Sequence, residues 1–200
     1  MTAVHMSAMI DRRRLLLLAP SGVLALGLAG AAAYLSFRPE QAAAIGGPFT
    51  LLDGNGRTVT ERQFRGRWML LYFGYTQCPD ACPTALQDMA NAVDLLPPDK
   101  RKEVALVFIT VDPERDTPAV VKDYVSGFEA GITALSGSAT QVADAARAFR
   151  VYYAKHPKDG GYDMDHSSII YLMDPKGRFV ANFTHETPPD RIATRLKAVL

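Results

Sequence analysis

Two cysteines, Cys78 and Cys82, are the residues whose type and spacing most directly permit chemistry in this sequence. They stand four positions apart, and the chain contains 2 cysteines in all. A pair this close can form a local disulfide, bind a metal ion or exchange disulfides with another protein. A purely structural disulfide would add little stability, because the entropy it removes from the unfolded chain grows with loop length. The spacing therefore favours a redox or metal site.

The cysteines directly follow an apolar run, 68–75, which predicts a strand buried on both faces. Pro83 is expected to open a helix that continues to about Leu95, before Pro97 and Pro98 end it. Open α/β sheets carry their sites at the carboxyl ends of strands, where both thiols fall. Residues four apart on a helix share one face, so the sulfur atoms are expected to converge. The partial positive charge at the helix start favours thiolates.

The donor set indicates which metal fits. A tetrahedral zinc site needs four ligands, and the sequence offers no further cysteine. Two thiolates with one imidazole instead suit copper, chiefly Cu(I). The third ligand must then come from a distant part of the chain.

The chain contains 4 histidines, which differ in their local sequence. His5 precedes a long apolar run, His156 lies in a charged segment expected to be a solvated loop, and His185 follows a predicted strand, where a surface role is usual. His166 precedes a strand at the same edge of the sheet as the cysteines. Spacing alone leaves His166 open between a ligand and a structural histidine.

Strands alternate with helices after residue 46, which predicts an α/β fold. A turn signal at 53–56 separates strands at 49–52 and 57–60 and predicts a hairpin. The other elements are expected at 104–111, 132–135, 167–173 and 178–183 for strands, and at 118–128, 140–149 and 190–200 for helices. This order predicts a mainly parallel sheet covered on both faces, with antiparallel hairpins at its margins.

The amino-terminal region contains an uncharged apolar run, 15–35, directly behind Arg12, Arg13 and Arg14. About 20 apolar residues suffice to cross a bilayer as a helix, and cytoplasmic flanks carry the excess of Lys and Arg. We therefore expect a cytoplasmic head at 1–14, a transmembrane anchor at 15–35, a linker at 36–45 and one exported domain at 46–200.

The main alternative to a retained anchor is a cleaved signal peptide, since 41–44 offers small residues for cleavage. The apolar run exceeds the length usual for a signal peptide, which favours the anchor. A twin-arginine signal rests only on the arginine cluster. The short head favours a single-pass protein of the bacterial inner membrane, with its domain in the periplasm, over a mitochondrial inner-membrane protein.

Charge excludes one class of partner. The 200 residues carry 22 basic and 21 acidic side chains, for a formal net charge of +1. No basic stripe runs along the chain, so nucleic acid is not an expected partner. The length suits one compact domain with a short appendage.

Three segments together resemble the signature segments of the Sco/SenC family: 72–83 with both cysteines, 111–118, and Asp165–Ser167. A similar hairpin, 171–179, follows them, and the resemblance covers about 46–200. It implies a thioredoxin-like domain with a central mixed sheet flanked by helices. It also implies a copper-binding protein that helps to assemble the binuclear copper site of cytochrome c oxidase, with Cys78, Cys82 and His166 as copper ligands. Whether Cu(I) or Cu(II) is the working form is left open by the sequence.

The resemblance implies a metallochaperone rather than an enzyme. Its expected partners are the copper-site subunit of the oxidase, a copper donor protein and a thiol reductant. The alternative is a thiol–disulfide oxidoreductase that reduces the cysteines of a copper-receiving partner, with Cys78 and Cys82 as its redox-active disulfide. Redox enzymes of this fold usually carry Cys-x-x-Cys, so the extra residue and His166 favour metal. A peroxidase is the weakest reading.

Three aspartates are candidates to support the site. Asp80 lies between the cysteines and either tunes the thiols or caps the helix. Asp112 ends the second buried strand and either approaches the site or stabilises a loop. Asp165 is a candidate to orient His166 through its second ring nitrogen. Nearby soft or aromatic residues are expected to pack in the core: Trp68, Tyr72, Met164 and Met173.

Overall fold

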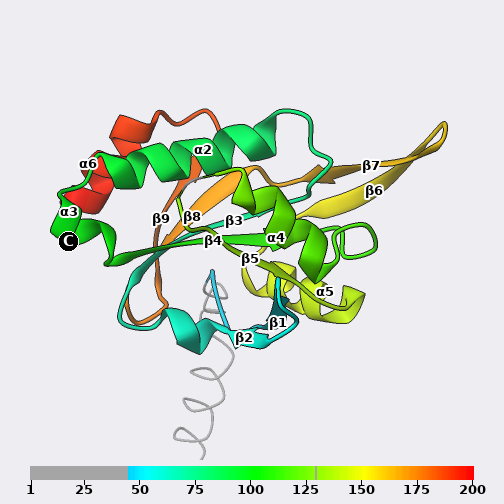
Figure 1. Ribbon diagram of the computed structural model, residues 1–200, viewed down its shortest axis with the longest axis horizontal. Coiled ribbons are helices and arrows are strands. Elements are labelled where there is room, and N and C mark those ends of the chain that lie inside the picture. Colours follow the sequence, from blue (N-terminus) through cyan, green and yellow to red (C-terminus); the bar gives the residue numbers. More distant parts are fainter. Residues whose placement is uncertain (1–44, 129) are drawn as a thin grey trace, which may run out of the picture. The chain divides into compact units, whose positions relative to one another are not determined.

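The computed structural model describes residues 45–128 and 130–200, which belong to one compact unit. Its main sheet contains strands β1 (Thr50–Asp53), β2 (Thr58–Thr60), β3 (Trp68–Gly74), β4 (Val104–Thr110), β5 (Thr133–Ser136), β8 (Ile169–Met173) and β9 (Phe179–Thr184). The seven strands lie in the order β2-β1-β5-β4-β3-β8-β9 (Figure 1). Strands β3, β4 and β5 are parallel, while the other pairings are antiparallel. The parallel centre and the antiparallel hairpins β1–β2 and β8–β9 at the margins match the prediction. The antiparallel pairings of β1 with β5 and of β3 with β8 make the sheet mixed rather than mainly parallel.

The helices connect and cover this sheet. They are η1 (Glu61–Phe64), α2 (Ala81–Asp94), α3 (Pro98–Arg101), α4 (Pro118–Ser126), α5 (Ala139–Ala148) and α6 (Pro189–Lys197). Helices α2 and α6 pack together along one side of the sheet, and α5 lies on the other side (Figure 1). Helix α4 begins at Pro118, as predicted, and α5 begins one residue before its predicted start. At their N-caps Thr117 and Ser138 each accept a hydrogen bond from the first turn.

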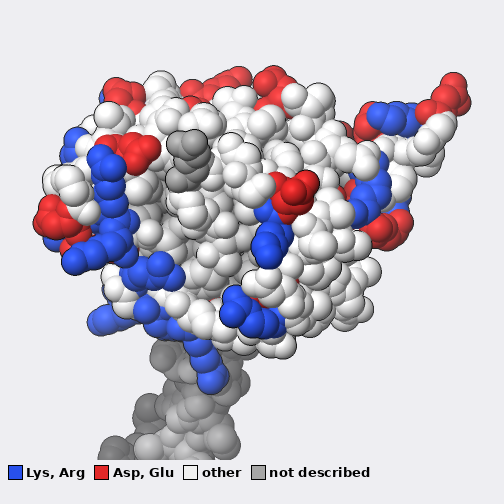
Figure 2. Space-filling view, viewed as in Figure 1, with Lys and Arg blue, Asp and Glu red and all other residues white. Residues whose placement is uncertain are grey.

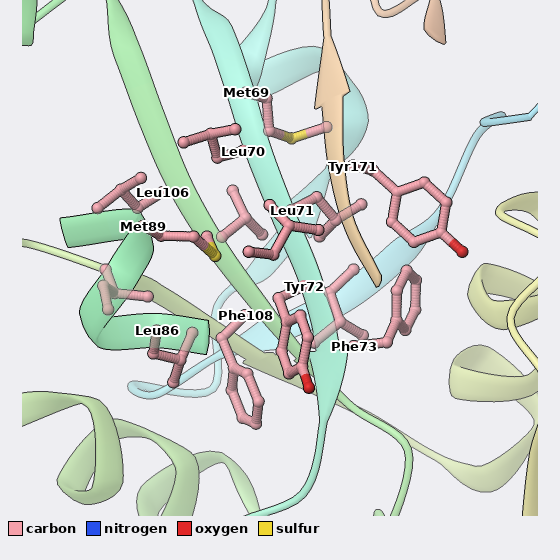
Figure 3. Close-up of a cluster of buried hydrophobic side chains, with 14 of the residues drawn as sticks. Met69, Leu70, Leu71, Tyr72, Phe73, Leu86, Met89, Leu106, Phe108 and Tyr171 are labelled. Atoms are coloured by element: carbon pink, nitrogen blue, oxygen red, sulfur yellow. The ribbon is translucent and has the colours of Figure 1, made fainter. Parts of the chain in front are cut away.

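Strand β3 is buried on both faces, as its continuous apolar run predicts. On one face Tyr72 lies beside Phe108 of β4, whose ring also packs against Tyr124 of α4. On the other face Phe73 packs against Phe149, 5.5 Å away between ring centroids. Figure 3 shows Tyr72 next to Phe108, and Phe73 on the side of β3 towards Tyr171. Side chains therefore pack against both faces of the central strand, and this packing fixes the point from which the following loop starts.

Helix α2 begins two residues earlier than predicted, with Asp80 at its N-cap position and Ala81 as its first residue. Pro83 lies in the first turn, where a proline costs no hydrogen bond of the helix. Cys82 is therefore inside the helix, whereas Cys78 precedes it. The expectation that both cysteines share one helix face is wrong. A turn, instead of a helical repeat, brings their sulfur atoms together.

A second, two-stranded sheet was not predicted from the sequence. Strands β6 (Tyr153–Lys158) and β7 (Gly161–His166) form a hairpin that projects from the body of the domain (Figure 1). Most of its side chains are exposed, and Met164 is the one buried residue of the two strands. Figure 2 shows charges of both signs along it. Without an apolar face the hairpin has no hydrophobic periodicity from which to predict it.

The predicted anchor at 15–35, its cytoplasmic head and the linker up to residue 44 lie outside the described residues. Within 45–128 and 130–200, no helix combines the length and the apolar character needed to span a bilayer.

Candidate metal centre

Cys78, Cys82 and His166 converge at the carboxyl end of β3. Their ligand atoms all lie within 4.8 Å of one another, and Cys82 Sγ is 3.4 Å from His166 Nε2. Both cysteines are free thiols. Residues separated by more than 80 positions in sequence thus present two sulfur atoms and one imidazole nitrogen to a common point.

The cysteine half of the centre is built into the core. Cys82 is fully buried, whereas Cys78 is half-buried. The Cys82 backbone N–H donates a hydrogen bond to Cys78 Sγ over 3.4 Å. Gly74 makes room for this arrangement, because a Cβ atom at that position would lie 2.7 Å from Cys82 Sγ and 3.0 Å from the Phe108 ring. Only glycine leaves space there for the buried sulfur.

The pKa values of the two thiols are shifted in opposite directions. A hydrogen bond from the Cys82 thiol, reinforced by His166 and by backbone N–H groups, lowers the pKa of Cys78 to about 4. The pKa of Cys82 is raised, first because its proton is held by Cys78 and second because the thiol is buried. At neutral pH the pair therefore carries one thiolate at the more accessible sulfur and one proton at the buried sulfur.

His166 ends β7 and is half-buried. Its Nδ1 lies 3.2 Å from the carbonyl oxygen of Ser167. In the tautomer that donates this hydrogen bond, Nε2 is left with a lone pair facing Cys82. The rings of Tyr72 and Tyr75 stand nearly perpendicular to the imidazole, with centroids 5.9 and 5.8 Å away, and restrict its rotation.

A buried carboxylate holds the start of the cysteine loop. Asp116 is fully buried and accepts hydrogen bonds from the Thr76 backbone N–H at 3.0 Å and from the Thr76 hydroxyl at 2.6 Å. It also accepts one from the Thr110 hydroxyl at 2.6 Å. These contacts tie the loop after β3 to the end of β4.

Arg115 joins the cysteine loop to the hairpin. Its Nη1 donates to Gln77 Oε1 and to the carbonyl oxygen of Tyr162, each at 2.9 Å. Its guanidinium carbon lies 3.8 Å from the centroid of the Tyr162 ring, and its Nε donates to Asp112. The Tyr162 hydroxyl also donates to Asp112 over 2.8 Å. This cluster of four side chains fixes the hairpin that carries His166.

The candidate supporting aspartates take different places. Asp80 occupies the N-cap of α2 without a side-chain capping bond, and its backbone N–H stabilises the Cys78 thiolate. Asp112 is buried in the Arg115 cluster and is not part of the group of ligand atoms. Asp165 does not orient His166 as expected. Its carboxylate lies 2.8 Å from His156 Nε2, and the Ser167 carbonyl takes the expected role.

Among the described residues, the other histidines are not part of the cluster of ligand atoms, and the two methionines lie in the core. His156 is exposed on β6 rather than in a loop. His185 follows β9, where its backbone N–H donates to the Ser168 carbonyl at 3.3 Å. Met164 is buried in β7, and Met173 pairs with Met69 at the opposite end of β3. Both methionines are core residues, as predicted.

Sequence reasoning missed the roles of Arg115, Asp116 and Tyr162. One signal was available for the first two, because Asp112–Asp116 places four charged residues one position after a fully buried strand. Charges at the carboxyl end of a buried strand must find partners or reach a site. Nothing in the local sequence marks Tyr162, whose position depends on the unpredicted hairpin.

Comparison with known proteins assigns the family. The SCO1/SenC family model matches residues 37–200. The chain belongs to this family. Its SCO1/SenC relative from Arabidopsis thaliana, the mitochondrial protein SCO1 homolog 1, is 46% identical over 139 residues, which cover 69% of this chain and 42% of the relative. The chain thus spans less than half the length of that relative.

Two solved structures of Sco proteins resemble this domain. ScoI of Bradyrhizobium japonicum, solved with copper bound, is 46% identical with a TM-score of 0.72, over 78% of this chain and 100% of that one. BsSco, described as a member of the Sco family of cytochrome c oxidase assembly proteins with a disulfide switch, is 25% identical with a TM-score of 0.61, over 78% and 94%. The SCO1/SenC domain has the thioredoxin-like α/β fold with a mixed central sheet that the resemblance implied.

Proposed function

We propose that this chain binds a copper ion through Cys78, Cys82 and His166 and takes part in assembling the copper site of cytochrome c oxidase. The observation that carries the proposal is the convergence of the three ligand atoms within 4.8 Å. Family membership supports it, as does the copper bound by the similar Bradyrhizobium protein.

The chemistry of the donor set fits Cu(I). Two thiolates and one imidazole give soft, low-coordinate ligation, and the described residues offer no fourth Cys, His, Asp or Glu in the cluster to complete a zinc tetrahedron. Cys78 presents a thiolate before the ion arrives, and Cys82 releases its proton when it becomes a ligand. Burial of Cys82 excludes water from one side of the ion.

Delivery requires that the ion leave as well as bind. Cys78 and His166 are half-buried, so the ion is accessible from their side of the centre. We propose that a copper donor loads the site from this side, that the copper-site subunit of the oxidase receives the ion there, and that a thiol reductant keeps both sulfur atoms reduced. The apolar run at 15–35 supports attachment to the bacterial inner membrane with the domain in the periplasm.

A second function is favoured by the asymmetry of the thiols. Cys78 is half-buried with a pKa of about 4, whereas Cys82 is buried and protonated. A partly exposed thiolate beside a buried second thiol suits attack on a partner's disulfide and resolution of the mixed disulfide. We therefore retain thiol–disulfide exchange with the oxidase subunit as the alternative.

Substitution of His166 by alanine separates the two functions. Loss of a supporting group costs a metal site about 10–100-fold in affinity, so loss of a ligand is expected to weaken Cu(I) binding by more than about 100-fold. Thiolate attack does not need the imidazole as a ligand, so His166→Ala should still cycle between dithiol and disulfide. The measurements are Cu(I) affinity, thiol redox cycling and oxidase activity in cells.

His156→Ala is the matched control, because it removes an exposed imidazole from the same hairpin. It should change none of the three measurements. If His166→Ala binds copper like the wild type but loses disulfide exchange, the copper function fails and the oxidoreductase function replaces it.

A further inference from the structure

The Tyr72 hydroxyl is a buried polar group without a hydrogen-bond partner among the described residues. Tyr72 is fully buried within β3. A hydroxyl in such a position costs free energy unless it is paired. An unpaired buried polar group needs a physical explanation, and one explanation is that the group gains its hydrogen-bond partner in another state of the protein.

Tyr72 lies against two of the proposed copper ligands. Its ring stands perpendicular to His166, with the centroids 5.9 Å apart. Its Cε1 atom lies 3.0 Å from the point where a Gly74 Cβ would be, and Cys82 Sγ lies 2.7 Å from the same point. Cε1 is the ring carbon next to the one that bears the hydroxyl, so the buried sulfur and the free hydroxyl are neighbours.

Tyr124 provides a contrast within the same core. Its hydroxyl is also buried and unpartnered. Its ring, however, packs against Phe108 and Phe128 rather than against a ligand. Burial of an unpaired hydroxyl therefore does not by itself indicate a role at the metal centre, whereas contact with His166 and proximity to Cys82 do.

We propose that the Tyr72 hydroxyl donates a hydrogen bond to Cys82 Sγ when copper occupies the site, and that it thereby favours Cu(I) over Cu(II). This inference rests on the proposed copper function. A cysteine bound to a metal is a thiolate, which accepts hydrogen bonds far better than a thiol does. Copper binding therefore turns the neighbouring sulfur into a strong acceptor for a hydroxyl that makes no hydrogen bond of normal geometry in the metal-free protein.

The expected effect on copper follows from the charge on sulfur. A hydrogen bond to a ligating sulfur withdraws electron density from it and so weakens its donation to the metal. Cu(II) depends on that donation more than Cu(I) does. Tyr72 is thus a positioning and tuning residue that acts through Cys82 and does not itself bind the ion.

The test compares Tyr72→Phe with Tyr124→Phe, since each removes one unpartnered buried hydroxyl and keeps the ring. Cu(I) and Cu(II) affinities are measured by competition with chelators on the reduced protein, and the sulfur-to-Cu(II) charge-transfer absorption is recorded. For Tyr72→Phe we expect Cu(I) binding to weaken about ten-fold relative to Cu(II) binding. The absorption should move to longer wavelength, because the sulfur becomes the stronger donor. Tyr124→Phe should leave both unchanged.

Thermal unfolding of the metal-free variants separates tuning from packing. Tyr72→Phe should unfold at or above the wild-type temperature, because it removes an unpaired polar group. An equal loss of affinity for Cu(I) and Cu(II), an unchanged absorption, or the same shifts in Tyr124→Phe would overturn the proposal. If the wild type bound no copper, the proposed function would fail as well, whereas copper binding unaffected by Tyr72→Phe would overturn the role of Tyr72 alone.

Discussion

Cys82 lies in α2 and Cys78 in the loop that joins β3 to α2, two elements of the core, whereas the histidine is carried by the β6–β7 hairpin, whose side chains are mostly exposed. The cysteine half is positioned by close packing around Cys82 and by the buried Asp116 network. The histidine half is positioned by the Arg115 cluster at the base of the hairpin.

This difference indicates that the two halves fail in different ways. A change of volume near Cys82 cannot be absorbed, because the surrounding core is close-packed. A change in the Arg115 cluster leaves the core intact but frees the hairpin, so that His166 no longer faces the sulfur atoms. Loading and release of copper are accordingly expected to involve the histidine half, since few buried contacts oppose its movement.

The largest effect is expected from Gly74→Ala, which perturbs the packing around the cysteines. The new Cβ would lie 2.7 Å from Cys82 Sγ, so the sulfur or the backbone must shift. Overpacking of this kind destabilises a core by about 1–3 kcal/mol, and copper binding should be lost. Urea unfolding and Cu(I) titration check both effects. Gly127→Ala is the control, because its Cβ would meet only a backbone oxygen at 3.6 Å. Wild-type copper affinity in Gly74→Ala would contradict the tight packing of the buried sulfur.

A smaller effect is expected from Arg115→Met, which removes contacts that hold the hairpin carrying His166. The variant leaves the buried Asp112 carboxylate without its guanidinium partner, and Arg115 is itself 21% exposed. We expect a loss of about 2 kcal/mol in the free energy of unfolding, less than the 3–5 kcal/mol typical of fully buried pairs. Cu(I) affinity should fall, while the thiols still form their disulfide.

Lys155→Met is the matched control for Arg115. Lys155 also places its cation over the Tyr162 ring, 4.2 Å from the centroid, but its carboxylate partner Glu114 is exposed. Exposed ion pairs contribute little, so this variant should behave like the wild type. Equal effects of the two substitutions would show that the hairpin is held by ring contacts and not by the Arg115 hydrogen bonds.

The smallest perturbation is a change of pH on the reduced, metal-free protein. The lowered pKa of Cys78 predicts that its alkylation by iodoacetamide rises with pH through a midpoint at about 4 and is constant near neutrality. The same shift stabilises the folded state fully above the ordinary thiol pKa of 9.0, and this contribution is lost as the pH falls towards about 4. Cys78→Ser should lack this dependence. An alkylation midpoint near 9 would contradict the hydrogen bonding at Cys78.

The cysteine half was largely predictable from the sequence. The apolar run of β3, the turn residues and the proline after Cys82 locate both thiols at the carboxyl end of a central strand. The exact start of α2 was not predictable, because Pro83 is compatible with several positions in a first turn. That difference of two residues decides whether Cys82 lies inside the helix.

The histidine half was much less predictable. Local sequence left His166 open, and only the resemblance to a family singled it out. The hairpin pairs polar and apolar residues without a consistent apolar face, as in Lys155 with Met164 and His156 with Asp163, so it lacks the periodicity that reveals buried strands. The partner of Asp165 depends equally on this register. Contacts made across a surface hairpin are not encoded in spacing along the chain.

X-ray absorption at the copper edge, on protein loaded with Cu(I), identifies the copper ligands by element, and metal analysis of the same sample gives the number of copper ions per chain. We expect one copper per chain with two sulfur ligands and one nitrogen ligand, and loss of the nitrogen ligand in His166→Ala. Copper with sulfur ligands alone in the wild type, or with two ions per chain, would contradict the assignment of Cys78, Cys82 and His166 as one site.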